Sequence, residues 1–254
     1  MTHPIKSYMP TVFIPVQQLK RSIEWYCELL DTPVQPKQDG GGIYYFNFAG
    51  TDLILDSNQW GFPPMIMFDS DDIDEAYSFC RQRGYEQIGE LYRRGGVAHF
   101  NVGSNMICYA EHRGKTGEHE LAHPLLPRIA RVIVHADDAA ASEAWYAAFL
   151  DRTAAQDRWV EDLRSFRMDH GADLLIDDNR LSRTETVHFE RLQLELRAHP
   201  AVIIATPDIE AARRHVLDKS PSQVSDIQHR LGLDLFTFAD PDGNGWMVAQ
   251  QKKL

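Results

Sequence analysis

The sequence contains an internal repeat, and this repeat constrains the fold more than any other feature. Residues 22–31 and 142–151 both start with serine, carry a Trp-Tyr pair and end in Leu-Asp, 120 positions apart. Three further pairs of similar segments follow in the same order. They are 50–56 with 171–177, 72–74 with 208–210, and 103–105 with 243–244. Four ordered matches indicate that two copies of one structural unit lie in tandem.

The repeat divides the chain into two units of similar length. Glycine and proline punctuate a charged stretch between them, which predicts a first domain at 1–115, a linker at 116–126 and a second domain at 127–254. The offset between matching segments grows from 121 to 136 residues between the second and the third pair. We therefore expect an insertion in the second domain near residues 180–199, where a polar stretch is compatible with a loop and a short helix.

Each half opens with the same pattern of apolar residues. Segments 11–16 and 129–135 are short and rich in β-branched residues, which predicts strands. Segments 19–30 and 138–150 carry apolar residues at three- and four-residue steps, which predicts a helix after each strand. Hairpins and further strands follow, and 72–83 predicts a second helix. Each half is therefore expected to have the order β-α-β-β-β twice.

These segments, in this order, resemble the vicinal oxygen chelate superfamily, which includes glyoxalases, bleomycin-resistance proteins and extradiol dioxygenases. Residues 16–26 are similar to that family's first strand-to-helix segment, and 71–76 and 207–212 are similar to the start of its second helix. Residues 239–244, Ala-Asp-Pro-Asp-Gly-Asn, resemble the turn into its last strand. The resemblance implies an α+β fold with two tandem domains. Each would build two βαβββ modules into a cupped mixed sheet, with the helices outside and a cleft inside.

Many members of that superfamily hold a divalent metal ion with His, Gln and Glu on the inner face of the cup. The matching positions here are Thr11, Ile54, Met65 and Cys108 in the first half, and Arg131, Leu175, Ala201 and Met247 in the second. None of these side chains supplies a carboxylate or an imidazole, and Cys108 is interpreted as a soft ligand without companions. The sequence therefore predicts no metal and no cofactor in this place. A site on other donors stays open, with His99, Glu111 and His135 nearest.

Composition limits the partners. The net charge is −11 at pH 7 and no basic stripe interrupts the sequence, so nucleic acid is not an expected partner. No apolar run is long enough to span a bilayer, and residues 1–10 lack the pattern of a signal peptide. We therefore expect a cytoplasmic monomer or homodimer without a membrane partner. The three cysteines are widely spaced and form no CxxC pair, which favours buried thiols.

Apolar and aromatic residues of the first half form the candidate ligand site. We expect a pocket lined by Phe13, Phe46, Met65, Met67 and His99, with Trp60 on a loop at its mouth. His99 is a candidate general base, although a hydrogen-bonded strand histidine is the simpler interpretation. Cys108 is a candidate nucleophile that is more simply explained as a packed thiol. Arg131, at the expected cleft floor of the second half, either clamps an anionic ligand or pairs with an acidic neighbour.

Three functions are compatible with these features. The first is a metal-free protein that binds a small organic molecule in the cleft, of the sequestration or resistance type. The second is an enzyme of the same superfamily, a lyase, isomerase or dioxygenase, with or without a metal. The third is an interaction module whose cleft is vestigial, which apolar packing across the cleft would favour. The missing metal donors favour the first function over a metal-dependent enzyme.

Overall fold

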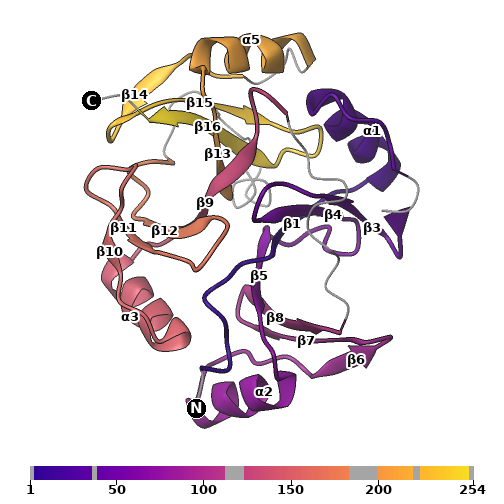
Figure 1. Cartoon of the computed structure of the whole chain (residues 1–254), viewed down its shortest axis with the longest axis vertical. Coiled ribbons are helices and arrows are strands. Elements are labelled where there is room, and N and C mark those ends of the chain that lie inside the picture. The colour runs from indigo at the N-terminus through magenta and orange to yellow at the C-terminus, as the bar shows by residue number, and fades with distance from the viewer. Residues whose placement is uncertain (1–2, 36–38, 112–122, 183–198, 220–223, 252–254) are drawn as a thin grey trace.

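The computed structural model describes residues 3–35, 39–111, 123–182, 199–219 and 224–251 (Figure 1). The first half contains β1 (Thr11–Pro15), α1 (Leu19–Leu29), β2 (Asp39–Gly40), β3 (Ile43–Phe46), β4 (Asp52–Asp56), β5 (Met65–Asp69), α2 (Ile73–Gln82), β6 (Tyr92–Arg94), β7 (Val97–Val102) and β8 (Asn105–Ala110). The second contains β9 (Arg128–His135), α3 (Ala139–Leu150), β10 (Ala155–Gln156), β11 (Arg164–Phe166), β12 (Asp173–Asp177), β13 (Val202–Ala205), α5 (Ile209–Lys219), β14 (Gln228–Arg230), β15 (Leu233–Ala239) and β16 (Gly245–Gln251). The predicted order, strand, helix and three strands, is confirmed for all four modules.

Each half forms one eight-stranded mixed sheet. The strand order is β2-β3-β4-β1-β5-β8-β7-β6 in the first sheet and β10-β11-β12-β9-β13-β16-β15-β14 in the second. In each sheet the first strand of the half pairs in parallel with the fourth and antiparallel with the fifth. Trp25 and Tyr26 lie in α1, and Trp145 and Tyr146 lie in the corresponding helix α3. The tandem architecture predicted from the repeat is therefore confirmed.

Two predicted segments fall mainly outside the described residues. The linker at 116–126 is described only from residue 123 onward, and most of the insertion near 180–199 lies in the stretch 183–198. The domain bounds 1–115 and 127–254 therefore stay predictions. Among the described residues, no helix has both the length and the hydropathy that crossing a membrane requires.

Aspartate side chains cap the N-termini of α2 and α3. The carboxylate of Asp72 accepts hydrogen bonds from the backbone N–H groups of Asp74 and Glu75, so it caps α2. Asp138 caps α3 in the same way by accepting from Ala141. Helix α2 ends before Gly84, whose φ of +70° is the left-handed conformation that favours glycine.

The helix-side faces of the two sheets share one hydrophobic core. Helix α1 of the first half lies beside the last module (Figure 1). There the rings of Tyr26 and Trp246 lie 5.6 Å apart. Helix α3 of the second half packs against the second module, where Phe149 lies 5.3 Å from Phe68. Helices α1 and α3 thus each pack on the sheet of their own half and also contact the other half, which joins the two halves.

Each of these two helices contributes a buried tyrosine whose hydroxyl forms hydrogen bonds with the other half. The hydroxyl of Tyr26 donates to Asp240 Oδ2 at 2.7 Å and accepts from Trp246 Nε1 at 2.9 Å. The hydroxyl of Tyr146 donates to Asn105 Oδ1 at 3.1 Å. The strand registers make Asn105 and Trp246 equivalent, so both tyrosines bond to the same position of the repeat.

Asp240 should make the stability of the protein depend on pH. Burial raises its pKa from 3.8 to about 6, although hydrogen bonds from Asn244 and Tyr26 lower it in part. Because the folded pKa is raised, this contribution is complete below pH 3.8 and is lost as the pH rises through about 6. We expect the free energy of unfolding of the wild type, relative to that of D240N, to be about 2 kcal/mol larger near pH 4 than at pH 7.

Urea denaturation of both proteins at several pH values measures this difference. Other groups with shifted pKa values, among them His99, His123 and Asp157, also change stability with pH, but they are present in both proteins, so the difference between the two profiles isolates Asp240. Parallel pH profiles for wild type and D240N would contradict the prediction.

One sequence alignment needs correction. Met67 pairs with Met106 in the first sheet, and the equivalent Ile203 pairs with Met247 in the second. Met247 therefore corresponds to Met106, and Ala249 corresponds to Cys108. The predicted match of Met247 with Cys108 is wrong by two residues. The reason is the hairpin length, because two residues join β7 to β8, whereas five residues, 240–244, join β15 to β16.

Candidate functional site

Side chains alternate along each strand, so each sheet has one face toward the helices and one concave face. The first concave face carries an apolar cluster that is separate from the helix-side core. Its members are Phe13, Ile54, Met65, Met106 and Cys108, with Ile43 and Met67 packed against them. They come from five neighbouring strands, β3, β4, β1, β5 and β8. Ile43 and Met67 are only half-buried, so part of this face is accessible.

The second concave face is closed by the chain itself. Its cluster includes Val160 and Leu163 from the loop between β10 and β11, and Leu181 from the turn after β12. The most exposed residue of the buried cluster, Ile133, is only 5% exposed. This is the apolar packing expected for a vestigial cleft. Trp159 and Leu231 are half-buried at the edge of this face, but Ile203 is fully buried where the equivalent Met67 of the first face is half-buried, so the sheet itself is more accessible in the first half.

Arg131 completes the closure of the second concave face. Its guanidinium donates to both carboxylate oxygens of Asp157, at 2.7 and 3.2 Å, and lies 3.6 Å from Asp173. Burial alone would raise the pKa of Asp157, but the hydrogen bond and the charge of Arg131 lower it below its ordinary value. Of the two interpretations of Arg131, pairing with an acidic neighbour is the one observed.

The structure brings most of the predicted ligand residues together, with one exception. Phe13, Met65, Met67 and Cys108 lie in one cluster on the first concave face. Phe46 lies on the opposite face, where its ring is 5.0 Å from Tyr44 and 5.8 Å from Tyr26 in the helix-side core. The prediction that Phe46 lines the same pocket as Phe13 is therefore wrong. Trp60 is half-buried in the turn that follows β4.

His99 stands on the same face as Cys108, because the two are register partners on β7 and β8. Its ring lies 5.0 Å from that of Tyr92. In the described part of the chain, its buried Nδ1 has no hydrogen-bond partner, which does not fit the interpretation as a hydrogen-bonded strand histidine. Burial lowers the pKa of His99, so the neutral imidazole is favoured.

Two residues of this region were missed by sequence reasoning. Met106 lies two residues before Cys108, so strand periodicity already places it on the same face. Tyr45 is a register partner of Ile54 on this face and is 38% exposed. Burial, and then the nearby Cys108 and Asp56, raise its pKa. Because 43–46 is apolar throughout, alternation alone did not separate Tyr45 from Phe46.

The first concave face does not fit a hard divalent ion. Such ions need several converging oxygen or nitrogen donors, whereas the cluster offers thioethers, a thiol and hydrocarbon. Asp56 lies at its edge, and its carboxylate accepts from the backbone and the side chain of Asn58. The donor chemistry of this face therefore differs from that of the metal-binding members of the family that the sequence resembles.

One other group of donors lies where the two halves meet. Asp31, after α1, faces His123 at 3.4 Å and His215 of α5 at 4.0 Å. The Nδ1 of His123 accepts from the backbone N–H groups of Leu125 and Leu126, so its proton is on Nε2, the atom that faces Asp31. Lys219 also contacts Asp31, at 3.2 Å. These contacts hold Asp31, His123 and Lys219 together. The one lone pair of neutral His123 is on Nδ1 and already accepts two hydrogen bonds, so none is left for a metal.

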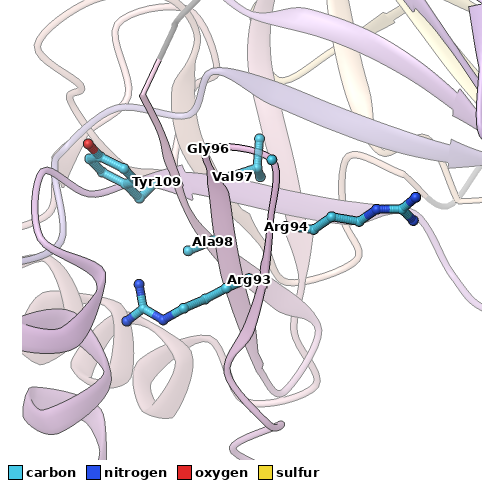
Figure 2. A pocket seen from close by; sticks show the side chains of 7 residues that line it. Arg93, Arg94, Gly96, Val97, Ala98 and Tyr109 are labelled. Atoms are coloured by element: carbon cyan, nitrogen blue, oxygen red, sulfur yellow. The ribbon is translucent and has the colours of Figure 1, made fainter.

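A surface hollow of 290 Å³ lies at the β6–β7 hairpin (Figure 2). Its lining includes Ala98 and Tyr109, which are register partners on the helix side of the sheet. Arg93 and Arg94 leave the hairpin in opposite directions, and Arg93 pairs with Asp74 of α2. This hollow includes none of the residues predicted to bind a ligand.

Comparison with known proteins identifies the fold. No family model and no curated protein matches the sequence. Solved structures do match. A Mn(II)-bound glyoxalase from Novosphingobium aromaticivorans is 11% identical, with a TM-score of 0.61 over 99% of this chain and 84% of that one. A catechol 2,3-dioxygenase is 11% identical, with a TM-score of 0.58 over 98% and 89%.

A third solved structure extends the comparison to ring-cleaving enzymes. The 2,2',3-trihydroxybiphenyl 1,2-dioxygenase of Sphingomonas wittichii strain RW1 is 13% identical, with a TM-score of 0.54 over 98% of this chain and 91% of that one. These matches cover both halves. The chain therefore has the fold of tandem glyoxalase-like and extradiol-dioxygenase-like domains, as the resemblance implied.

Proposed function

We propose that the chain binds a small, mainly apolar organic molecule on the first concave face, without a hard divalent metal ion. The observation that carries this proposal is the contrast between the two concave faces. Both faces have two half-buried residues at their edges, but Met67 on the sheet of the first face is half-buried, whereas the equivalent Ile203 is fully buried in a cluster with the loop residues Val160 and Leu163 of the second. Ligand sites are typically concave and mainly apolar, with a few polar groups, and His99 and Tyr45 supply such groups here.

Binding alone accounts for this arrangement, so the proposal is a sequestration role without turnover. The acidic surface favours neutral or cationic ligands and disfavours nucleic acid. A cytoplasmic location and a monomeric or homodimeric state belong to the same proposal. A lyase, isomerase or dioxygenase is the second candidate, favoured by the fold and by the neutral imidazole of His99 on this face.

A charged side chain on the first concave face should abolish ligand binding. Replacing Met67 with lysine places an ammonium among apolar groups, whereas V34K changes a residue that is 48% exposed outside the cluster. We expect organic compounds that raise the melting temperature of the wild type to do the same for V34K and to have no effect on M67K. Such compounds raise stability because they bind the native state alone.

Tryptophan fluorescence tests the same proposal through Trp60, the residue that the sequence predicts at the mouth of the site. With a compound identified in that screen, the fluorescence change should be smaller in W60A than in the wild type. W159A is the matched control, because Trp159 lies against Arg131 at the second concave face. A compound that stabilises M67K as well as the wild type would show that it binds elsewhere. A screen without any such compound would favour the vestigial cleft.

A further inference from the structure

Sulfur atoms gather on the first concave face. Three of the seven methionines of the chain, Met65, Met67 and Met106, lie there together with Cys108. Met67 and Met106 are register partners on the parallel strands β5 and β8. On the same face, Met65 lies two residues before Met67 and Cys108 two residues after Met106, on opposite sides of this pair. Register partners on neighbouring strands lie about 5 Å apart at their Cα atoms, so Met67 and Met106 can reach a common point beside Cys108, whereas Met65 lies further along the face.

A nitrogen donor lies beside the sulfur atoms. His99 on β7 is the register partner of Cys108. Its Nδ1 is buried and has no hydrogen-bond partner among the described residues. A buried polar atom without a partner costs free energy, and a bound ligand atom would offset that cost. The sulfur atoms and the imidazole therefore occupy one patch on three adjacent strands.

The second concave face shows that the fold does not require this composition. The strand registers make Ala201, Ile203, Met247 and Ala249 equivalent to Met65, Met67, Met106 and Cys108, and Leu235 equivalent to His99. Aliphatic side chains thus fill four of the five positions in the other copy of the same sheet. Five potential donors stand at these positions in the first half, and a single thioether stands there in the second.

We propose that the first concave face binds one soft monovalent cation of the Cu(I) or Ag(I) class, with the thiolate of Cys108, the imidazole of His99 and methionine thioethers as ligands. Thiolate and thioether ligands select Cu(I), whereas hard ions need oxygen. On binding, Cys108 releases its proton to solvent, the sulfur–metal bond forms, and the ion keeps its oxidation state. This inference goes beyond organic-ligand binding and predicts that ion and organic ligand compete for one face.

Titration of the reduced, full-length protein tests the proposal, with Ag(I) as the air-stable probe and Cu(I) in competition with a chelator under nitrogen. The variant M65L/M67L/M106L removes the thioethers but keeps an apolar surface of similar volume. C80S and M247L are matched controls, since Cys80 is buried in α2 and Met247 lies on the second concave face. We expect one ion per wild-type chain and a weakening of about tenfold or more in the triple variant, because even outer-shell changes cost that much.

The controls should bind the ion as the wild type does. Equal ion affinity in the triple variant and in the wild type would overturn the proposal, because it would show a thiol acting alone. Loss of binding in C80S with retention in C108S would also overturn it. An organic compound from the stability screen should still bind the triple variant, because leucine preserves the apolar surface. Failure of the ion proposal is therefore distinguishable from failure of the proposed function.

Discussion

Replacing Gly50 with alanine should destabilise the protein far more than the same replacement at Gly61. Both glycines have positive φ, +92° and +99°, so the backbone cost of a side chain is similar at the two positions, about 1–2 kcal/mol. They differ in their surroundings. A Cβ at Gly50 would lie 2.6 Å from the Cα of Gly171, whereas a Cβ at Gly61 has no atom within 4 Å.

The close contact at Gly50 joins the two halves. Gly50 and Gly171 are equivalent positions of the repeat, in the turns that precede β4 and β12. Beside them the hydroxyl of Thr51 accepts from the backbone N–H of Ala172 at 3.0 Å and donates to the carbonyl of Met9. Because backbone atoms meet backbone atoms, no side chain can move aside, and a Cβ must separate the halves.

We expect G50A to lower the free energy of unfolding by about 3 kcal/mol or more, in the range of the most disruptive substitutions. Urea denaturation of wild type, G50A and G61A gives the comparison. A change in the urea dependence for G50A alone would show, in addition, that the halves no longer unfold together. An equal decrease in the free energy of unfolding of G50A and G61A would mean that the close contact between the two turns does not contribute to stability.

The fold could be predicted from the sequence because the repeated segments are recognised from patterns of a few neighbouring residues. The Trp-Tyr pairs, the helix caps and the period of each strand all act over a few residues. The same locality explains the failures at the site. Phe46 was assigned to the wrong face because its strand is apolar on both faces, and Met247 was mismatched because the preceding turns differ in length.

Other features of the site depend on residues that are distant in sequence. Tyr26 and Asp240 are 214 positions apart, and no local pattern connects them. The closure of the second concave face depends on a loop that folds over its own sheet, which the composition of that loop does not reveal. The sulfur patch was in part predictable, because Met65 and Met67 were assigned to the cleft. Sequence reasoning treated Cys108 as a soft ligand without companions, and the structure places Met106 and Met67 in its cluster.

Removing the guanidinium of Arg131 should cause the other large loss of stability. The R131M variant leaves the carboxylate of Asp157, which is 6% exposed, without its ionic partner. Breaking a buried ion pair on one side costs about 3–5 kcal/mol, because the remaining charge stays buried. R180M is the matched control. Arg180 forms a similar contact with Asp178 at 2.8 Å but is exposed, so its loss should change stability little.

The pH dependence of R131M separates a buried charge from lost packing. In the wild type the pKa of Asp157 is lowered, so its contribution is present above pH 3.8 and is lost as the pH falls through the folded value. Without Arg131, burial is the main influence and should raise that pKa above 3.8. The variant should therefore recover part of its stability as the pH falls from 7 toward 4, where Asp157 becomes neutral.

Adding D157N should recover stability at pH 7 as well, because it removes the unpaired charge. A loss in R131M that is independent of pH and unchanged by D157N would assign the effect to the contact of Arg131 with Trp159 instead.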